Sequence, residues 1–360
     1  MKTLFITGAA GYVGAMLCDQ FSKRPDVGEI IALDMENTPE LLKDNPKVHW
    51  IKANTADMSW QDGVRVKSPS VVIHTAWQIR ELYGRRRLQW HWNVRGSTHI
   101  FDFALKTPSV KKLVHFSSAA VYGAEKSNTF DQLFTEGDPL REEEYSYGKE
   151  KVTVEKILRG AWEKSGSRAH GTTQVFVLRP AAITGPRGRY MRTRFGLQSA
   201  LSGQLKGDFV YKIISAMVSF VPATPRWVRQ FIHEDDVCDI VAMLTFNDVP
   251  GTHETFNSTP PGEPVYAPQM ARAVGKRVLR VYPWMVRLAY FVFWHITRGK
   301  VPTSRGIWRF YSYPIVMDGS RLTREYGYRY RYSSRDAFAY TNGRYERYVP
   351  EKMRKANSKF

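Results

Sequence analysis

The chain has 360 residues and a formal net charge of +19, with 53 Lys and Arg against 34 Asp and Glu. This length can bury a large core and is typical of two lobes. Apolar runs stay shorter than the roughly 18 residues of a membrane span, and the first strand begins by Thr3, which leaves no room for a signal peptide. Cys18 and Cys238 lie in apolar helical patterns, so we expect core positions, no disulfide and a cytoplasmic protein.

The positive charge is concentrated toward the C-terminal end. Residues 271–360 hold 20 Lys and Arg and 5 Asp and Glu, a balance of +15, whereas residues 1–270 hold 33 against 29, a balance of +4. This asymmetry indicates an anionic partner, such as a membrane surface, a nucleic acid or an acidic protein. A basic surface that is simply solvated is the alternative.

The first predicted element is an apolar strand over residues 2–7, which turns on glycines into a helix over 12–23. The turn reads Thr7-Gly8-Ala9-Ala10-Gly11-Tyr12-Val13-Gly14. Backbone N–H groups at the start of such a helix suit a pyrophosphate. The second strand, 29–34, ends in Asp34, and a carboxylate there accepts hydrogen bonds from an adenosine ribose and repels a 2′-phosphate. Together the two features predict NAD as the cofactor, in preference to NADP.

Strand and helix patterns continue to alternate up to Pro180, which is typical of an α/β fold with a Rossmann-type, doubly wound parallel sheet. The remaining strands are expected at 47–52, 70–74, 112–117 and 174–179, and the remaining helices at 94–106 and 147–164. After Pro180, prolines interrupt the pattern, which predicts a smaller substrate-binding lobe. We expect an NAD-binding domain over 1–180 with the helical stretch 228–250 packed back on it, a substrate-binding lobe from 181–227 and 251–335, and a basic tail over 336–360.

Residues 281–298 form an unusually apolar segment. Pro283 suits the first turn of a helix, and the residues that follow, 284–294, are apolar nearly all round. The segment is too short to cross a bilayer, so it is either a buried helix or one that lies at a membrane interface. Arg287 and Arg298 would suit a headgroup boundary. We favour burial, because most such helices in enzymes are packed.

A serine, a tyrosine and a lysine carry the predicted chemistry. Ser118 follows the strand at 112–117, and Tyr147 and Lys151 stand four residues apart, on one face of the next long helix. A free tyrosine has a pKa of about 10 and is a poor base. A neighbouring ammonium and the positive ring of NAD⁺ would stabilise the phenolate and lower that pKa. We therefore expect Tyr147 to be the acid/base group, Lys151 its pKa partner and Ser118 the group that holds the substrate oxygen.

These motifs resemble those of the extended short-chain dehydrogenase/reductase family, the NAD-dependent epimerase/dehydratase group. The resemblance runs from residue 2 to about 260 and includes His74-Thr75-Ala76, Asn93-Val94-Arg95-Gly96-Ser97, Leu178-Arg179-Pro180 with Gly185-Pro186, and Gln230-Phe231-Ile232-His233-Glu234-Asp235-Asp236-Val237. It implies NAD and no metal. The implied cofactor-binding residues are Gly8, Ala10, Gly11, Tyr12, Val13, Gly14, Asp34, Asn54, Thr55, His74, Thr75, Ala76, Asn93, Tyr147, Lys151 and Pro180. The implied substrate-binding residues are Trp77, Ser118, Ala119 and Arg229.

A second tyrosine fits the same spacing. Tyr145 and Lys149 are also four residues apart. We prefer Tyr147 because Tyr147-Gly148 and Glu155 reproduce the family string, whereas Tyr145 would leave a threonine in the place of that glutamate. In this interpretation Glu155 is a structural residue of the helix rather than a catalytic one.

Departures from the family pattern narrow the chemistry. Ala119 and Ala120 stand where sugar-nucleotide 4,6-dehydratases carry an Asp-Glu pair, so elimination of water lacks its acid. Ala182 replaces an asparagine that contacts the substrate diphosphate in many sugar-nucleotide enzymes. Asn54 replaces the aspartate that meets the adenine amino group, and its amide oxygen can still accept that bond. Trp77 adds bulk near the expected nicotinamide pocket.

Arginines favour a phosphorylated substrate, because guanidinium groups match phosphate oxygens. Arg229 stands where sugar-nucleotide 4-epimerases carry a diphosphate-binding arginine. Two further clusters lie in loops that face the cofactor cleft in this fold. They are Arg85-Arg86-Arg87, and Arg187, Arg189, Arg192 and Arg194. Solvated loop charge is the alternative for each cluster.

The leading hypothesis is a sugar-nucleotide epimerase that transiently oxidises a secondary alcohol. The alternative enzyme is an NAD-dependent dehydrogenase or reductase of an apolar, steroid-like alcohol, favoured by Ala182, Trp77 and the apolar segment 284–294. A third hypothesis is a cofactor-sensing protein without turnover, against which the intact Ser-Tyr-Lys set argues. The expected partners are a small-molecule substrate and a second copy in a homodimer, with an anionic membrane as a further candidate and no nucleic acid.

Overall fold

The computed structural model describes residues 1–360 except 166–172, 189–219, 274, 341, 350 and 352–360. The chain divides into two compact units. The first contains Met1–Ser118, Tyr147–Arg179 and Cys238–Phe256. The second contains Ala119–Ser146, Pro180–Val237 and Asn257–Phe360.

The first unit is built on a seven-stranded sheet. Its strands are β1 (Lys2–Thr7), β2 (Val27–Asp34), β3 (Val48–Lys52), β4 (Val71–His74), β5 (Lys112–Phe116), β7 (Gln174–Pro180) and β12 (His253–Ser258). Their order is β12-β7-β5-β4-β1-β2-β3, and every pair from β7 to β3 runs parallel. The expected doubly wound, Rossmann-type sheet is confirmed, and each predicted strand lies within two residues of its expected bounds. The edge strand β12 is not predicted by the sequence pattern.

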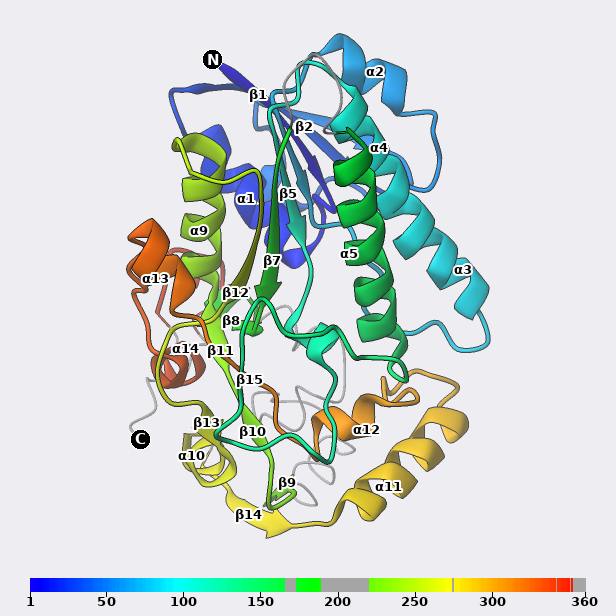
Figure 1. Ribbon diagram of the computed structural model, residues 1–360, viewed down its shortest axis with the longest axis vertical. Coiled ribbons are helices and arrows are strands. Elements are labelled where there is room, and N and C mark those ends of the chain that lie inside the picture. The colour runs from blue at the N-terminus through cyan, green and yellow to red at the C-terminus, as the bar shows by residue number, and fades with distance from the viewer. Residues whose placement is uncertain (166–172, 189–219, 274, 341, 350, 352–360) are drawn as a thin grey trace. The chain divides into compact units, whose positions relative to one another are not determined.

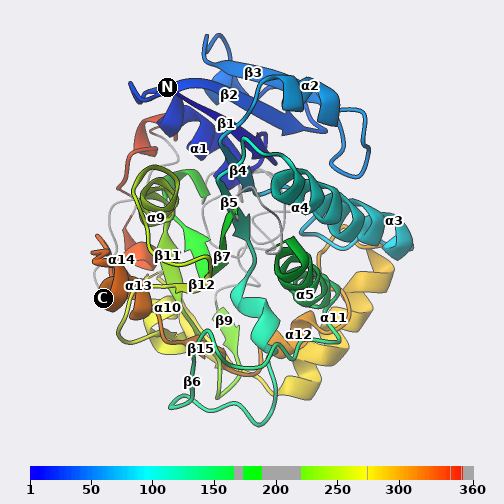
Figure 2. The ribbon, with the colours of Figure 1, turned by 45° about the horizontal axis from the view of Figure 1, so that its top comes forward.

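Continuous apolar runs explain why these strands form the core. Leu4–Ile6 of β1 and Val175–Leu178 of β7 are buried throughout, as expected for strands that are covered on both faces. Helices α4 and α5 cover one face of the sheet, and α1 and α9 cover the other (Figure 1 and Figure 2). The helical elements that accompany the sheet are α1 (Tyr12–Ser22), η1 (Glu40–Leu42), α2 (Gln61–Val66), α3 (Arg86–Trp90), the π-helical turn η2 (His91–Arg95), α4 (Gly96–Lys106), α5 (Ser146–Ser165) and α9 (Glu234–Phe246).

The strand order reverses between β1 and β4. The chain leaves β1 for β2 and β3 on one side and returns to β4 on the other side of β1. The carboxyl ends of β1 and β4 therefore form the switch point at which doubly wound sheets bind their ligands. The glycine-rich turn follows β1 directly and so lies at this point.

The second unit consists of short paired strands and helices. Its strands are β6 (Leu133–Phe134), β8 (Ala182–Thr184), β9 (Phe220–Ala223), β10 (Val228–Arg229), β11 (Phe231–His233), β13 (Val265–Tyr266), β14 (Arg277–Arg280) and β15 (Val316–Met317). Its helical elements are η3 (Ala119–Tyr122), α10 (Ala267–Ala273), α11 (Pro283–Ile296), α12 (Ile307–Phe310), α13 (Arg321–Tyr326), α14 (Ser334–Ala339) and η4 (Glu346–Tyr348). The strands pair two by two: β10 with β13, β11 with β8, β14 with β9, and β15 with β6.

The division of the chain differs from the sequence-based boundaries. Residues 119–146 belong to the second unit, and residues 251–256 belong to the first. The expected tail begins inside α14, and the chain after that point still contributes buried side chains, namely Ala337, Ala339, Tyr345 and Val349. The chain over 336–340 and 342–349 is therefore folded into the second unit, and residues 341, 350 and 352–360 lie outside the described residues.

The apolar segment near residue 284 is not a core helix. It forms α11, with Pro283 at its first position as expected, but Trp294 is its one buried residue. The sequence pattern is apolar on every side of this helix and so does not show which side has a partner. No helix among the described residues has the length and apolarity that a membrane span needs. The two cysteines are fully buried, as expected.

Candidate cofactor and catalytic site

The glycine-rich turn between β1 and α1 is tightly packed. Gly8 has a φ of +72°, and a Cβ atom there would lie 2.5 Å from the backbone nitrogen of Ala76. Gly14 lies too close to the Gly8 carbonyl for any side chain. Within the described structure, no side chain caps α1 at Gly11, and the first turn of that helix contains no acidic residue. The first turn of α1 therefore carries no acidic side chain of its own, which suits a pyrophosphate at the positive end of the helix.

Asp34 is held beside this turn. Its Oδ2 atom accepts a hydrogen bond from the Ala10 backbone N–H (2.9 Å), and its Oδ1 atom accepts one from the Glu36 N–H (3.0 Å). The carboxylate at the end of β2 thus has a fixed place next to the pyrophosphate turn, as NAD recognition requires. The residues of this region fit the predicted cofactor.

His74 has a structural use that the sequence pattern does not show. Its ring nitrogens bond the hydroxyls of Thr7 (2.7 Å) and Ser97 (2.9 Å), which ties β4 to β1 and α4. Burial, with a smaller contribution from Lys151, lowers the pKa of His74 to about 3. Both ring nitrogens are occupied by these two hydroxyls, and the cofactor contact expected from His74 stays a prediction. Thr75 likewise donates its hydroxyl proton to the Thr7 carbonyl (2.7 Å).

Asn54 and Thr55 follow β3 in a compact turn. The Asn54 amide oxygen accepts a hydrogen bond from the Ala56 N–H (2.8 Å), so the acceptor expected to meet adenine also closes this turn. Thr55 is buried and stands so close to Gly96, at the start of α4, that no Cβ atom fits there. Pro180 is buried at the last position of β7.

Asn93 lies in the π-helical turn and joins a buried polar network. Its Nδ2 atom donates to Glu150 (2.6 Å) and to the Gln78 carbonyl (3.0 Å), while its Oδ1 atom accepts from the Gln78 N–H (2.7 Å). Gln89 also donates to Glu150 (3.1 Å). Burial raises the pKa of Glu150, and these two donors act in the opposite direction. Sequence reasoning missed Glu150, although its place on the apolar face of α5 is a sign of a buried acid.

Ser118, Tyr147 and Lys151 come together at the end of β5. The side chains of Tyr147 and Ser118 are hydrogen-bonded. The Lys151 Nζ atom donates to the Phe116 carbonyl (2.6 Å) and lies 6.0 Å from the centre of the Tyr147 ring. Tyr145 behaves differently, because its ring packs against Phe310, with centroids 5.2 Å apart. Among the two tyrosines, Tyr147 is the one in contact with Ser118.

Burial dominates the electrostatics of Tyr147 and Lys151. Burial raises the pKa of Tyr147, and the hydrogen bond with Ser118 offsets only part of that rise. Burial also lowers the pKa of Lys151 well below its usual value, against the opposing effect of Glu155 and Glu150. The polypeptide alone therefore does not lower the pKa of Tyr147, and the lowering expected from Lys151 and the NAD⁺ ring together stays a prediction. A further positive charge, such as an oxidised nicotinamide ring, is needed to favour the phenolate.

Trp77 packs directly on this trio. The Lys151 Nζ atom lies 3.4 Å from the centre of the Trp77 ring, which is a close cation–π contact. The same ring meets Tyr147 edge to face, with centroids 6.3 Å apart. The bulk that the sequence places after β4 is thus in contact with two of the predicted catalytic side chains.

Glu155 forms a buried ion pair with Arg179. Its carboxylate accepts hydrogen bonds from Arg179, at 2.7 Å from Nη2 and 3.1 Å from Nε, and from the Ser117 hydroxyl. Both charged side chains are only 6% exposed. The pair joins α5 to β7, and the bond from Ser117 adds the residue that precedes Ser118.

Comparison with known proteins decides the family. Residues 4–257 match the model of the NAD dependent epimerase/dehydratase family. The chain belongs to this family. Its cofactor is NAD.

Individual relatives are distant. The uncharacterized protein y4nG of Sinorhizobium fredii is 27% identical over 259 residues, which are 71% of this chain and just over half (56%) of that protein. A decarboxylating sterol-4-alpha-carboxylate 3-dehydrogenase of Candida albicans is 26% identical over 204 residues, 53% of each protein. The solved structure of the Bordetella bronchiseptica enzyme WbmG in complex with NAD and UDP has a TM-score of 0.67 at 21% identity, covering 93% of this chain and 91% of that one. This likeness to WbmG concerns the fold.

The arginines singled out in the sequence have different surroundings. In the second unit, the half-buried Arg229 donates to the Phe310 carbonyl (3.2 Å), and its guanidinium lies 5.2 Å from the centre of the Tyr311 ring. In the first unit, Arg85–Arg87 are exposed, and Arg86 pairs with Glu81 (2.7 Å). Arg187 is buried, whereas Arg189, Arg192 and Arg194 lie outside the described residues.

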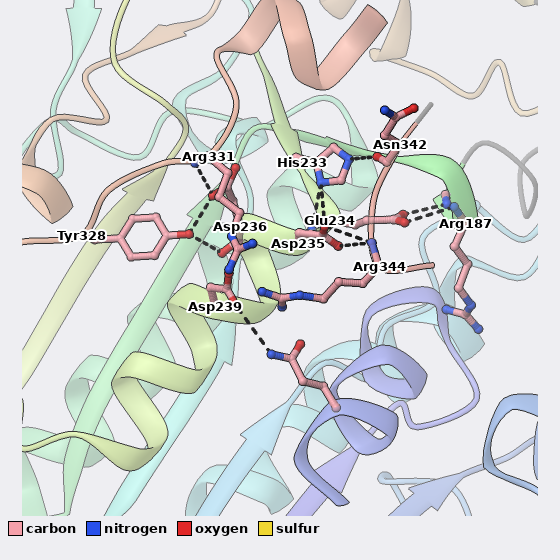
Figure 3. Close-up of polar contacts among 12 residues, drawn as sticks. Arg187, His233, Glu234, Asp235, Asp236, Asp239, Tyr328, Arg331, Asn342 and Arg344 are labelled. Atoms are coloured by element: carbon pink, nitrogen blue, oxygen red, sulfur yellow. Dashed lines mark hydrogen bonds and ion pairs between the residues drawn. The ribbon is translucent and has the colours of Figure 1, made fainter. Parts of the chain in front are cut away.

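The acidic motif at the start of α9 also has a structural use (Figure 3). Its three carboxylates each accept hydrogen bonds from a different segment of the second unit. These bonds join Glu234 to the N–H of Arg187 (3.1 Å), Asp235 to the N–H of Arg344 (3.1 Å), and Asp236 to the N–H of Arg331 (2.9 Å) and the hydroxyl of Tyr328 (2.8 Å). Acidic side chains in the first turn of a helix also interact favourably with the positive end of the helix dipole. The motif therefore connects three segments of the second unit.

Ala119 is the first residue of η3, and Ala182 is the first residue of β8.

Proposed function

We propose that this chain is a sugar-nucleotide epimerase that transiently oxidises a secondary alcohol of the sugar. Bound NAD⁺ would supply the acceptor for the carbon-bound hydrogen as hydride and would later return it. Tyr147 would take the hydroxyl proton as the alcohol becomes a ketone, and would give that proton back when the hydride is returned to the other face, so that the carbon is inverted with no net redox change. The contact between Tyr147 and Ser118 supports this assignment, because a serine hydroxyl beside the phenol can hold the reacting oxygen for proton transfer.

The observation that carries the choice of substrate is Arg229. This half-buried guanidinium is approached by a backbone carbonyl and an aromatic ring, and no carboxylate pairs with it among the described residues. A cation with only neutral neighbours retains donors for an anionic ligand, and a diphosphate is the anion of a sugar nucleotide. The UDP bound by WbmG is consistent with this choice. Ala119 and Ala120 supply no acid for loss of water, which favours epimerisation over dehydration.

A second candidate is oxidation of an apolar alcohol. Trp77 covers Lys151 with an apolar surface in the first unit, and in the second unit the Arg229 guanidinium lies 5.2 Å from the centre of the Tyr311 ring. The similarity to a sterol dehydrogenase supports the same alternative. In this case the reaction ends at the ketone, and NADH is a product.

The two candidates differ in what accumulates. The purified protein is incubated with NAD⁺ and either UDP-hexoses deuterated at the reacting carbon or a 3-hydroxysterol, and both the products and NADH are measured. We expect an epimer that retains its deuterium, with no accumulation of NADH. Arg229→Met should raise the KM for the sugar nucleotide at least about tenfold, whereas Arg305→Met, which changes an exposed arginine of the same unit, should leave KM unchanged. Stoichiometric NADH from the sterol would support the second candidate instead, and NAD binding without any turnover would support the cofactor-sensing hypothesis.

A further inference from the structure

The outer side of α11 is an exposed apolar surface. Trp284, Leu288 and Phe291 are 64%, 56% and 63% exposed, and their spacing of four and three residues places them on one side of the helix. Further exposed apolar residues widen this surface, namely Met285, Val292, Phe293 and Ile296. Contiguous apolar patches of this kind mark sites of interaction with proteins or membranes.

The inner side of α11 is fixed to the second unit. The Thr303 hydroxyl donates to the Tyr290 carbonyl (2.9 Å), and the Tyr290 ring packs against Tyr311, with centroids 5.4 Å apart. The Arg287 guanidinium lies 5.7 Å from the centre of the Trp308 ring, and Trp294 is buried. The apolar outer side therefore belongs to an anchored helix, and its exposure does not come from a detached segment.

Strand β14 leads directly into α11 (Figure 1). All four of its residues, Arg277–Arg280, are also exposed, with two apolar side chains in the middle of the strand and an arginine at each end. Phe220 lies on β9, where it pairs with Arg277 of β14, and it is also exposed (42%). The surface thus combines apolar side chains with arginines.

The charge of this region has a single sign. Residues 264–317 contain nine Lys and Arg and no Asp or Glu. Arg277 and Arg280 precede α11, Arg287 lies within it, and Arg298 and Lys300 follow it, all of them at least partly exposed. Basic residues around an exposed apolar helix complement the anionic headgroups that cover an apolar bilayer interior.

We propose that α11 and β14 form a docking surface for a lipid bilayer that contains anionic lipids. The 14 residues of α11 span about 21 Å, which is too short to cross a bilayer. The helix therefore lies in the plane of the interface, with its outer side among the upper acyl chains. Trp284 and Tyr282 then lie at the level where aromatic side chains are favoured. A second copy of the chain is a poorer occupant, because a two-fold contact would bring two basic surfaces together.

Vesicle flotation of the full chain tests this proposal. Vesicles of phosphatidylcholine alone are compared with vesicles that also contain phosphatidylserine, at low and high salt. We expect binding to the anionic vesicles that weakens as salt is added. The double variant Leu288→Glu/Phe291→Glu should bind at least about tenfold more weakly. Val66→Glu, which introduces the same charge at an exposed apolar position in α2 (84% exposed), should bind like the wild type.

The charge and the occupant are tested separately. Each of Arg277→Gln and Arg280→Gln should weaken binding to anionic vesicles about fivefold. A probe attached to a cysteine introduced at Phe291 should report an apolar environment when vesicles are added, and the two native cysteines are buried and do not compete for the label. Absence of flotation at low salt overturns the proposal, as does full binding by the double variant. A dimer that dissociates on Leu288→Glu substitution, seen by sedimentation velocity, overturns it in favour of a second copy. None of these measurements depends on the substrate.

Discussion

Removing the carboxylate of Glu155 should destabilise the fold far more than an ordinary surface change. The change is Glu155→Leu. It deletes two charge-assisted hydrogen bonds to Arg179, at 2.7 Å and 3.1 Å, each of which contributes about 1.5–3 kcal/mol. It also leaves a guanidinium that is 6% exposed without this counter-charge. The two bonds together therefore contribute about 3–6 kcal/mol. Breaking a buried pair costs about 3–5 kcal/mol, so we expect a loss of about 3–5 kcal/mol in the free energy of unfolding.

Urea denaturation followed by tryptophan fluorescence measures this loss. Glu163→Leu is the matched control, because Glu163 lies on the same helix and pairs with Arg159 in an exposed contact (2.6 Å, with side chains 52% and 55% exposed). Exposed pairs of this spacing contribute about 0.3–0.5 kcal/mol. The double variant Glu155→Leu/Arg179→Leu should recover much of the stability that Glu155→Leu loses, because neither charge then remains buried. A loss below about 1 kcal/mol for Glu155→Leu, or a double variant that loses the sum of the two single losses, would refute the reasoning.

Three further outcomes are expected. NAD should bind more tightly than NADP, and Asp34→Ala should narrow the difference, as measured by intrinsic fluorescence; equal affinities in the wild type would remove Asp34 from this role. Tyr147→Phe should lower kcat by about 10²–10⁴-fold with NAD binding retained, and loss of turnover in Tyr145→Phe alone would shift the active tyrosine by two residues. The pKa of His74 is about 3, below its unfolded value of 6.5, so the unfolded chain takes up this proton first as the pH falls. As the pH falls from 6.5 to 3, His74 should therefore lower the free energy of unfolding by about 1.4 kcal/mol per pH unit. A His74→Gln variant whose free energy of unfolding has the same dependence on pH as that of the wild type would contradict this.

The parts of the fold that the sequence predicts are those set by neighbours along the chain. A run such as Val175–Leu178 is apolar because sheet neighbours cover both faces, and the turn after β1 needs glycine because its backbone packs on Ala76. By contrast, β12 is an edge strand with the mixed sequence His253–Ser258, so its pattern resembles a loop. Periodicity locates strands that are covered on both sides better than strands at an edge.

The candidate site shows the same limit. The spacing of Tyr147 and Lys151 follows from one helix, and the local pattern predicts it. The bond from Asn93 to Glu150 joins positions 57 residues apart, and the ring of His74 is occupied by side chains from two other elements. Such contacts depend on how the sheet and helices assemble. The exposure of α11 also depends on tertiary packing, because the sequence of a helix that is apolar on all sides does not indicate which side is buried.

The expected homodimer stays a prediction.

The chain passes between its two units five times, at residues 119, 147, 180, 238 and 257. Neither unit is a continuous stretch of the gene, so neither can be produced by cutting the chain at one point. During synthesis, β5 remains the open edge of the sheet until β7 is made, and β7 in turn remains open until β12 has emerged. Unpaired edges of this kind expose the nascent chain to association with other chains. A protein truncated after residue 180 would keep the apolar strand β7 at the edge permanently, so expression should include the chain through β12 and the segments of both units.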